Sequence, residues 1–208
     1  MTRTTIGIVD YGIGNHASVR HTLHDLGYRC RVSAEAAALE ACDLLLLPGV
    51  GAFPPAMRAL RTRGLDRFVI DWVGGGRALI GICLGMQLLA QSSDEGVMTP
   101  GLGVLPGDVA ALGSGRWHIG WNSLDRPATP DDDPLFRASY GHTFYFNHSF
   151  VYRGPQEFVA AVTRLGDNRF ASAVRRGSVV GMQFHPEKSQ ASGRVLLRTL
   201  LEGLSRAE

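Results

Sequence analysis

The segment that most constrains the fold is an apolar run that passes directly into a helical pattern through a cysteine. Residues 78–82 read Ala-Leu-Ile-Gly-Ile, and Cys83 is followed by Leu-Gly-Met-Gln-Leu-Leu-Ala. A strand that turns this sharply into a helix has room only for small neighbours, which Gly81 and Gly85 supply. Such a turn is typical of a nucleophile, whose sulfur would lie near the first free N–H groups of the helix. Taken alone, the segment could equally hold a buried core cysteine.

The first half of the chain alternates short apolar runs with amphipathic ones, which is the pattern of a parallel α/β sheet. Glycines end several of the amphipathic runs, as expected at the ends of helices. The expected strands lie at residues 6–10, 28–32, 44–47 and 78–82, and the expected helices at 17–26 and 84–91, with one or two more between 54 and 73.

The second half, from about residue 102 to 180, is richer in β-branched and aromatic residues and in turn signals. We expect antiparallel strands there, with residues 143–152 as the central one. Residues 179–184 should return to the main sheet, and a helix over 191–204 should complete the fold. We therefore predict a single α/β domain over residues 1–208, with a three-layer arrangement: a mostly parallel central sheet flanked by helices, extended by antiparallel strands from the second half.

A histidine and a glutamate follow the cysteine at a distance of about one hundred residues, in the segment Gln183-Phe-His-Pro-Glu187. In an extended chain alternate side chains project to the same side, so His185 and Glu187 can point together. Glu187 could then accept from one imidazole nitrogen and leave the other facing the sulfur of Cys83, as in a nucleophile–base–orienter triad. A histidine bonded for structural reasons is the alternative, and the pairing with the Cys83 turn favours the triad.

A third segment could supply the donors that acyl transfer to a cysteine requires. Four leucines at 44–47 make a short buried strand, and Pro48-Gly-Val-Gly51 ends it with backbone free to approach a ligand. The developing oxyanion needs N–H groups aimed at it. We expect one from Leu84 and a second from the backbone around Val50 and Gly51. Because glycines flank Val50, the loop could turn its N–H away until a partner selects the competent conformation.

Six motifs, in the same order and over nearly the whole chain, resemble those of the triad-type class I glutamine amidotransferases. The Gly-x-Cys-x-Gly and His-Pro-Glu motifs indicate only this wider class. Asp-Tyr-Gly-x-Gly-Asn, Pro-Gly-Val-Gly and Gly-Trp-Asn resemble more narrowly the glutaminase subunits of imidazole glycerol phosphate synthases. The motifs lie at residues 9–15, 47–53, 81–87, 118–122, 145–149 and 183–189.

This resemblance implies an enzyme in which Cys83 attacks the side-chain amide of glutamine, forms a glutamyl thioester and releases ammonia, after which water frees glutamate. It implies no cofactor. Taken alone, Gln87 could be a solvent-side helix residue and Glu95 an ordinary loop charge. The residues that the resemblance assigns to holding glutamine are Gly49, Gly51, Gln87, Glu95, His148 and Ser149.

The resemblance also implies a heterodimer. The partner is a (β/α)₈-barrel cyclase subunit, which uses the ammonia to make imidazole glycerol phosphate and an aminoimidazole carboxamide ribotide in histidine biosynthesis. The positions that match its contact surface are Asn15, Trp121, Asn122 and Lys188.

Two stretches depart from the family pattern, and both lie where partner contact is expected. Arg116-Trp-His118 stands where a Pro-His pair is common, and Asn147 and Phe150 flank His148-Ser149 where an apolar residue and a tyrosine are common. These departures leave open a paralogous subunit that supplies ammonia to a surface-sugar-modifying synthase. A cysteine hydrolase or peptidase of related fold and a non-catalytic interaction subunit are further alternatives.

The composition argues against several other classes of protein. Twenty-one basic and 19 acidic residues are well mixed, so we expect neither nucleic acid nor a membrane surface as a partner. No stretch approaches the ~18 apolar residues that cross a bilayer, and the N-terminus does not read as a signal peptide. Three cysteines, without metal spacing or an even disulfide framework, fit a reducing compartment, and we expect a cytoplasmic protein.

No metal site is expected. The acidic run from Asp131 to Asp133 is better explained as a solvated turn, because three adjacent carboxylates cannot all face one ion. His21 and His24 are three residues apart on a predicted helix but have no acidic or thiol ligand beside them, so we expect them on the surface.

Overall fold

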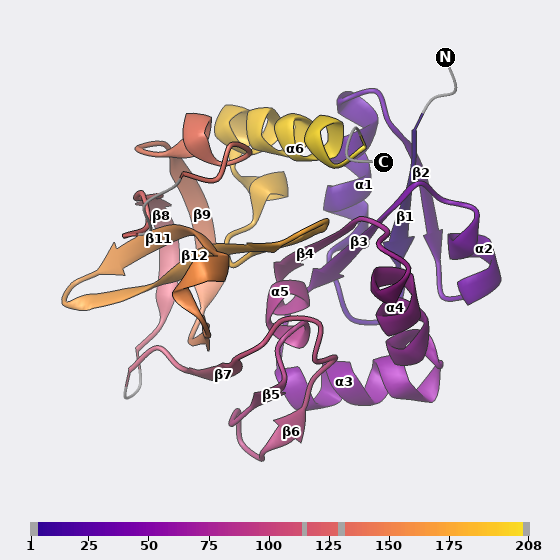
Figure 1. Ribbon diagram of the computed structural model, residues 1–208, viewed down its shortest axis with the longest axis horizontal. Helices are drawn as coiled ribbons and strands as arrows, with labels where there is room; N and C mark the ends of the chain where they lie inside the picture. The colour runs from indigo at the N-terminus through magenta and orange to yellow at the C-terminus, as the bar shows by residue number, and fades with distance from the viewer. Residues whose placement is uncertain (1–3, 114–115, 129–131, 206–208) are drawn as a thin grey trace.

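The computed structural model describes residues 4–113, 116–128 and 132–205 of the chain (Figure 1). Its first half builds a parallel sheet in the order β4-β3-β1-β2, which confirms the strands expected there to within two residues. In the second half of the chain, strand β13 pairs in parallel with β4. The expected return of the chain to the main sheet is therefore also confirmed. The five strands are β1 (Thr5–Val9), β2 (Arg29–Ser33), β3 (Leu44–Gly49), β4 (Leu79–Cys83) and β13 (Val179–Met182).

Two antiparallel strands extend this sheet beyond β13. β12 (Asn168–Arg176) pairs with β13, and β11 (Val159–Leu165) pairs with β12, so the full order is β11-β12-β13-β4-β3-β1-β2. The predicted fold class, a mostly parallel sheet with an antiparallel extension, is therefore confirmed.

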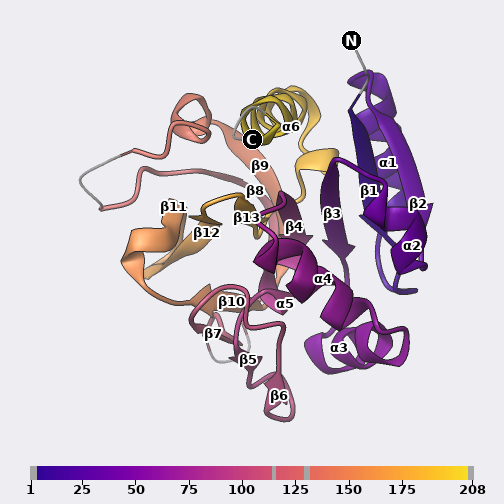
Figure 2. The same ribbon diagram turned by 45° about the vertical axis from the view of Figure 1, so that its right-hand side comes forward.

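Helices cover both faces of the sheet, because its central strands are apolar on both sides. Ile80 and Ile82 of β4 belong to the core cluster that includes α1 (His16–Asp25) and α6 (Gln190–Leu204). Leu79 belongs to the cluster on the opposite face, which includes the other helices. Figure 2 shows α6 above the sheet and α3 below it. The helices of the second cluster are α2 (Ala36–Glu40), α3 (Phe53–Thr62), α4 (Leu65–Gly74) and α5 (Leu84–Leu88).

The long C-terminal helix shows why these layers hold together. Five leucines recur along one side of α6, and each buried leucine contributes about 1.5–3 kcal/mol to the free energy of folding. The five leucines are Leu196, Leu197, Leu200, Leu201 and Leu204.

None of the helices within the described residues combines the length and the apolar character that a membrane span requires.

Two helical predictions differ from the structure. Helix α2 was not expected, because five residues are too few to show a helical period. Helix α5 ends at Leu88 rather than at residue 91, because the N–H of Gln91 donates to the carbonyl of Gly107 at 2.8 Å instead of to the helix, and a neighbouring loop donates to the carbonyls that follow Gln87. The N–H groups of Leu102, Gly103 and Leu105 donate to the carbonyls of Leu88, Ala90 and Leu89 at 2.9, 3.0 and 2.8 Å.

The expectation of one central strand over residues 143–152 is wrong, because the chain changes sheets at Ser149. β9 (Thr143–His148) pairs with β8 (His118–Ser123) in a two-stranded antiparallel sheet. β10 (Phe150–Arg153) belongs instead to a small four-stranded sheet. The other members of that sheet are β7 (Asp108–Ala111), β5 (Ser92–Ser93) and β6 (Thr99–Pro100), and three short 3₁₀ helices, η1 (Arg137–Ser139), η2 (Gln156–Phe158) and η3 (Pro186–Lys188), join the remaining segments.

Candidate active site

Cys83 ends β4 in a backbone conformation that few residues other than glycine adopt, with φ 54° and ψ −111°. Close packing holds it there. A Cβ added to Gly85 would lie 1.9 Å from the carbonyl oxygen of Leu47, and one added to Gly81 would lie 2.8 Å from that of Gly85. The expected need for small neighbours is thus confirmed. Such strain costs about 1–3 kcal/mol and persists only where the surroundings enforce it, which is typical of functional sites.

The parallel pairing of β13 with β4 brings two predicted motifs to the same edge of the sheet. Gly181 lies opposite Gly81, so Gln183 and His185, just beyond the end of β13, lie beside Cys83. The amide nitrogen of Gln183 lies 3.8 Å from the sulfur of Cys83. Gln183 is fully buried, and its contact with Cys83 was not predicted from the sequence.

His185 and Glu187 form a buried pair. The imidazole Nδ1 lies 2.8 Å from Glu187 Oε1, and the two side chains are only 2% and 1% exposed. An extended chain was expected to align them, but Glu187 lies in η3, one residue into a 3₁₀ turn. Burial alone would lower the pKa of His185, but hydrogen bonds to Cys83 and Glu187 outweigh it and raise this pKa to about 10. His185 therefore holds its proton at neutral pH.

The loop after β3 runs beside the cysteine, because β3 and β4 stay paired as far as Gly49 and Cys83. Tyr11 fixes the start of this loop, because the Tyr11 hydroxyl donates to the carbonyl of Pro48 at 2.8 Å. Gly49 packs under the Cys83 turn, where an added Cβ would lie 2.6 Å from the N–H nitrogen of Gly85. Gly51, with φ 97°, has open space around it. Tyr11 was not expected here, although the Asp-Tyr-Gly motif at the end of β1 points to the same sheet edge.

A cavity of about 420 Å³ opens above these groups, a volume that suits a small-molecule ligand. It brings together nearly all the predicted site residues; Gly49 and Glu187 lie outside its lining. Four lining residues were not predicted: Ala52, Trp117, Asn147 and Phe150. The predicted residues that line it are Cys83, His185, Val50, Gly51, Leu84, Gln87, Glu95, His148 and Ser149.

Two polar residues that line the cavity are held by internal bonds. Gln87 is buried, not solvent-facing, and its amide nitrogen lies 2.9 Å from the carbonyl of Phe150 and 3.1 Å from Gln183 Oε1. Glu95 accepts the N–H of Phe53 at 2.8 Å. Burial raises the pKa of Glu95, and the hydrogen bond from Phe53 offsets part of that rise.

On the hairpin side of the cavity, His148 at the end of β9 lines the wall, and His118 on β8 lies behind it. His148 Nδ1 lies 2.9 Å from the carbonyl of Phe150, and His148 Nε2 lies 3.1 Å from His118 Nδ1. Burial, followed by the charges of His118 and His185, lowers the pKa of His148 to about 3 despite the opposing effect of the Phe150 carbonyl. Burial also lowers the pKa of His118. Both rings are thus neutral at pH 7.

The residues expected at the partner surface divide into two kinds. Trp121 is 49% exposed, and Lys188 is exposed with its amine 5.8 Å from the ring centre of Tyr145. Asn15 instead caps α1 by accepting the N–H of Ser18 at 3.4 Å. Asn122 also bonds within the chain, because its amide nitrogen donates to the carbonyl of Arg164 at 2.8 Å.

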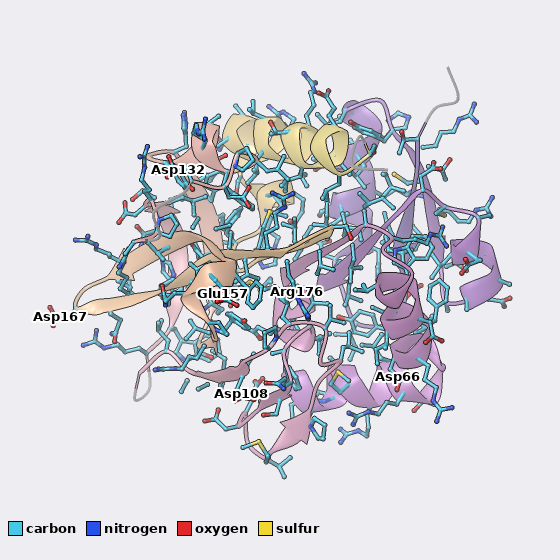
Figure 3. All side chains as sticks on the ribbon, viewed as in Figure 1. Asp66, Asp108, Asp132, Glu157, Asp167 and Arg176 are labelled. Carbon is cyan, nitrogen blue, oxygen red and sulfur yellow. The ribbon has the colours of Figure 1, made fainter. Side chains whose placement is uncertain are left out.

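No group of three or more potential ligands in residues 4–113, 116–128 and 132–205 could hold a metal ion. In the acidic run, Asp131 lies outside the described residues, while Asp132 and Asp133 pair with Arg126 and Arg175 at 3.1 and 3.3 Å. Figure 3 shows Asp132 at the margin of the molecule.

Comparison with known proteins adds independent findings. The model of the glutamine amidotransferase class-I family matches residues 7–201. The chain is 46% identical over 193 residues to the imidazole glycerol phosphate synthase subunit HisH of Symbiobacterium thermophilum, which covers 90% of this chain and 89% of the relative. It is 42% identical to the same subunit of Halalkalibacterium halodurans, over 93% of each chain.

Solved structures show the same similarity. A crystal structure of a glutamine amidotransferase has a TM-score of 0.73 at 26% identity, covering 97% of this chain and 98% of the other. The structure of PurLQS from Thermotoga maritima has a TM-score of 0.76 over 98% of this chain and all of the other. Its identity is 19%, so that likeness concerns the fold alone.

Proposed function

This chain belongs to the class-I glutamine amidotransferases, in the family of the HisH subunits of imidazole glycerol phosphate synthase, and we infer that it hydrolyses glutamine at Cys83 and supplies the ammonia to a partner subunit for histidine biosynthesis. The family names of the relatives favour this pathway over a surface-sugar synthase. No feature of the cavity specifically favours a peptidase.

The observation that carries the proposal is the convergence at Cys83. A cysteine in a strained conformation lines a cavity together with His185, and the imidazole of His185 is bonded to a buried carboxylate at 2.8 Å. A structural cysteine needs none of these features. A nucleophile requires all of them, because attack, proton transfer and orientation of the ring are separate tasks.

In the first half of the reaction, the sulfur of Cys83 attacks the side-chain amide carbon of glutamine. The N–H of Leu84 and one from Val50 or Gly51 stabilise the oxygen that becomes negative. Each such donor raises the rate about 10²–10³-fold. As the carbon–nitrogen bond breaks, His185 gives its proton to the departing nitrogen, which leaves as ammonia. Glu187 keeps the ring oriented by accepting its Nδ1–H.

In the second half, neutral His185 takes a proton from water as the water oxygen attacks the thioester. The carbon–sulfur bond then breaks, which leaves the sulfur on Cys83 as a thiolate and frees glutamate, whose new carboxylic acid group releases its proton to water. The imidazole is again protonated, so the site is restored to its starting state. The pKa of about 10 supports this role, because His185 begins the cycle with the proton that the ammonia must take.

Substrate binding falls to the polar residues around the cavity. Glu95 presents a carboxylate that complements the α-ammonium group of glutamine, and the backbone at His148 and Ser149 lines the opposite wall. The amide nitrogen of Gln87 supports the cavity wall, because it is already bonded to the carbonyl oxygen of Phe150 and to Gln183 Oε1.

The ammonia passes to a second synthase subunit, a (β/α)₈-barrel cyclase. The exposed apolar side chains of Trp117, Ile119 and Trp121 support a contact surface on this side of the molecule. Lys188 lies on the same side, next to Tyr145.

The test is glutamate release by the complex of this chain with its synthase partner. Cys83→Ala should lower the rate at least about a thousandfold, while the partner still turns over with an ammonium salt in place of glutamine. Cys30→Ala, which removes a thiol on β2, is the matched control and should leave the rate unchanged. Full glutamine-dependent activity in Cys83→Ala would refute the proposal.

A further inference from the structure

A continuous series of hydrogen bonds runs from β8 to the wall of the cavity. The amide nitrogen of Asn122 lies 3.2 Å from His118 Nε2, and His118 Nδ1 lies 3.1 Å from His148 Nε2. His148 Nδ1 then lies 2.9 Å from the carbonyl oxygen of Phe150. The proposed reaction uses none of these imidazole contacts.

The inner end of the series fixes which nitrogens carry protons. The carbonyl of Phe150 can only accept, so His148 must carry its proton on Nδ1. A neutral His148 then offers Nε2 as an acceptor, and His118 must donate to it from Nδ1. His118 in turn has only Nε2 left, as an acceptor.

The outer end imposes the same assignment independently. The side-chain oxygen of Asn122 accepts the N–H of Ser123 at 2.8 Å, and its amide nitrogen donates to the carbonyl of Arg164 at 2.8 Å. The amide is therefore oriented so that its second N–H points to His118 Nε2. Both ends agree on two neutral rings, each with its proton on Nδ1.

The two rings are held rigidly. His118 and His148 are only 3% and 5% exposed. The ring of His118 stacks on Phe146 at 4.4 Å and meets Phe170 edge-on at 5.6 Å. A buried nitrogen that lost its partner here would gain no water in exchange, so the hydrogen bonds determine the ring positions.

The series continues beyond Phe150 to the nucleophile. The Phe150 carbonyl also accepts from Gln87, whose amide nitrogen lies 3.1 Å from Gln183 Oε1. The amide nitrogen of Gln183 lies 3.8 Å from the sulfur of Cys83. The segment at residues 147–150 is thus held from both sides, by His118 through His148 and by Gln87.

We propose that His118 is a positioning residue of the glutaminase site: its Nδ1–H holds the His148 ring, and with it the cavity wall at residues 147–150, where that wall receives glutamine beside Cys83. The inference rests on the proposed function. It gives β8 a second role, because the neighbouring residues Ile119 and Trp121 are exposed on the same strand. A partner bound to them would contact the strand that carries His118.

The kinetic test compares two substitutions in the complex with the synthase partner. His118→Phe keeps an aromatic ring against Phe146 but leaves His148 Nε2 without a donor, and it should raise KM for glutamine about tenfold while kcat changes less than about threefold. His118→Asn restores an N–H near the Nδ1 position and should return KM to within about threefold of the unsubstituted chain. His21→Asn, on the exposed side of α1, is the control.

Chemical labelling of Cys83 separates positioning from reactivity. A glutamine-analogue affinity label should modify Cys83 more slowly in His118→Phe, whereas iodoacetamide should modify it at the unchanged rate. An unchanged KM and labelling rate in His118→Phe would overturn the inference, as would a fall in kcat alone. Neither result would affect the proposed function, which fails only if Cys83→Ala stays active.

A spectroscopic test needs no substitution that could impair folding. Long-range ¹⁵N–¹H correlation of the imidazoles at pH 7 should show His118 and His148 as neutral rings with the proton on Nδ1. Either ring found with its proton on Nε2, or charged, would overturn the inference even if His118→Phe did not fold.

Discussion

The two sides of the proposed active-site cavity are built in different ways. On the sheet side, Cys83 is fixed by its own backbone conformation and by glycines packed too closely for any side chain. On the hairpin side, formed by β8, β9 and the turn into β10, the wall is fixed by side-chain hydrogen bonds through His118 and His148.

This difference matches what each side has to hold. A strained backbone locked by close packing cannot move without a clash, so it suits the reacting atoms, whose positions decide the rate. Hydrogen-bonded side chains can adjust by small shifts, so they suit the wall that receives the substrate. Substitutions on the sheet side should therefore affect kcat or folding, and those on the hairpin side should affect KM.

The largest effect should come from removing the proposed proton carrier on the sheet side. His185→Asn should lower kcat for glutamine hydrolysis at least about a thousandfold with little change in KM, because it removes the base and leaves the cavity wall intact. Steady-state glutamate release by the complex is the measurement, with His24→Asn on the exposed side of α1 as control. A main effect on KM instead would break the division between the two sides.

The next effect concerns stability. Gly85→Ala places a Cβ 1.9 Å from the backbone oxygen of Leu47 and should lower the free energy of unfolding by about 3 kcal/mol or more. Gly74→Ala is the matched control, because its Cβ meets nothing within 4 Å, and the change should stay within about 1 kcal/mol. Urea unfolding measures both. Equal midpoints for the two variants would show that the Cys83 turn is not tightly packed.

The two sides should also respond to pH with opposite sign. His148 has a pKa of about 3 in the folded protein and an ordinary value near 6.5 when unfolded. Below pH 6.5 the unfolded chain therefore binds a proton that the folded one does not, and stability falls by up to about 1.4 kcal/mol per pH unit. His185 behaves in the opposite way. With a folded pKa of about 10, its contribution to the free energy of unfolding is complete below pH 6.5 and is lost as the pH rises toward 10.

Unfolding free energies measured from pH 5 to 8 check this contrast. His148→Asn should flatten the dependence between pH 5 and 6.5, and His185→Asn should flatten it between pH 6.5 and 8. The charged or titratable groups that act on His148 are His118 and His185, and both oppose its protonation. If either variant flattened the opposite limb, the assignment of one sign to each side would be wrong.

The sheet side could be predicted from the sequence because its constraints are local. The apolar strands and the glycines at 81 and 85 lie within a few residues of Cys83, and parallel strands bring their carboxyl ends to one edge. The pairing of His185 with Glu187 was also predicted, although a 3₁₀ turn and not an extended chain produces it.

The hairpin side could not be predicted in the same way. Residues 143–152 read as one strand, and nothing local shows that the chain changes sheets at Ser149. The contact between His118 and His148 spans 30 residues and depends on the register of β8 against β9, where the two residues lie directly opposite. The end of α5 likewise depends on a loop that follows more than ten residues later. Such pairings are set by tertiary structure, not by sequence pattern.

The smallest effect should be on binding of the partner. Trp121 is 49% exposed, and its ring meets Tyr145 edge-on at 6.1 Å, which leaves apolar area free for a partner to cover. Trp121→Ala should weaken binding of the synthase partner about tenfold, near 1.4 kcal/mol, while the unfolding free energy of the chain changes by less. Val195→Ala, at an exposed apolar site on α6, is the control for titration calorimetry. Because Trp121 lies on the hairpin side, any accompanying kinetic change should be in KM. An unchanged affinity would show that the partner does not contact β8. A link between the partner and the cavity wall through this strand would then also be wrong.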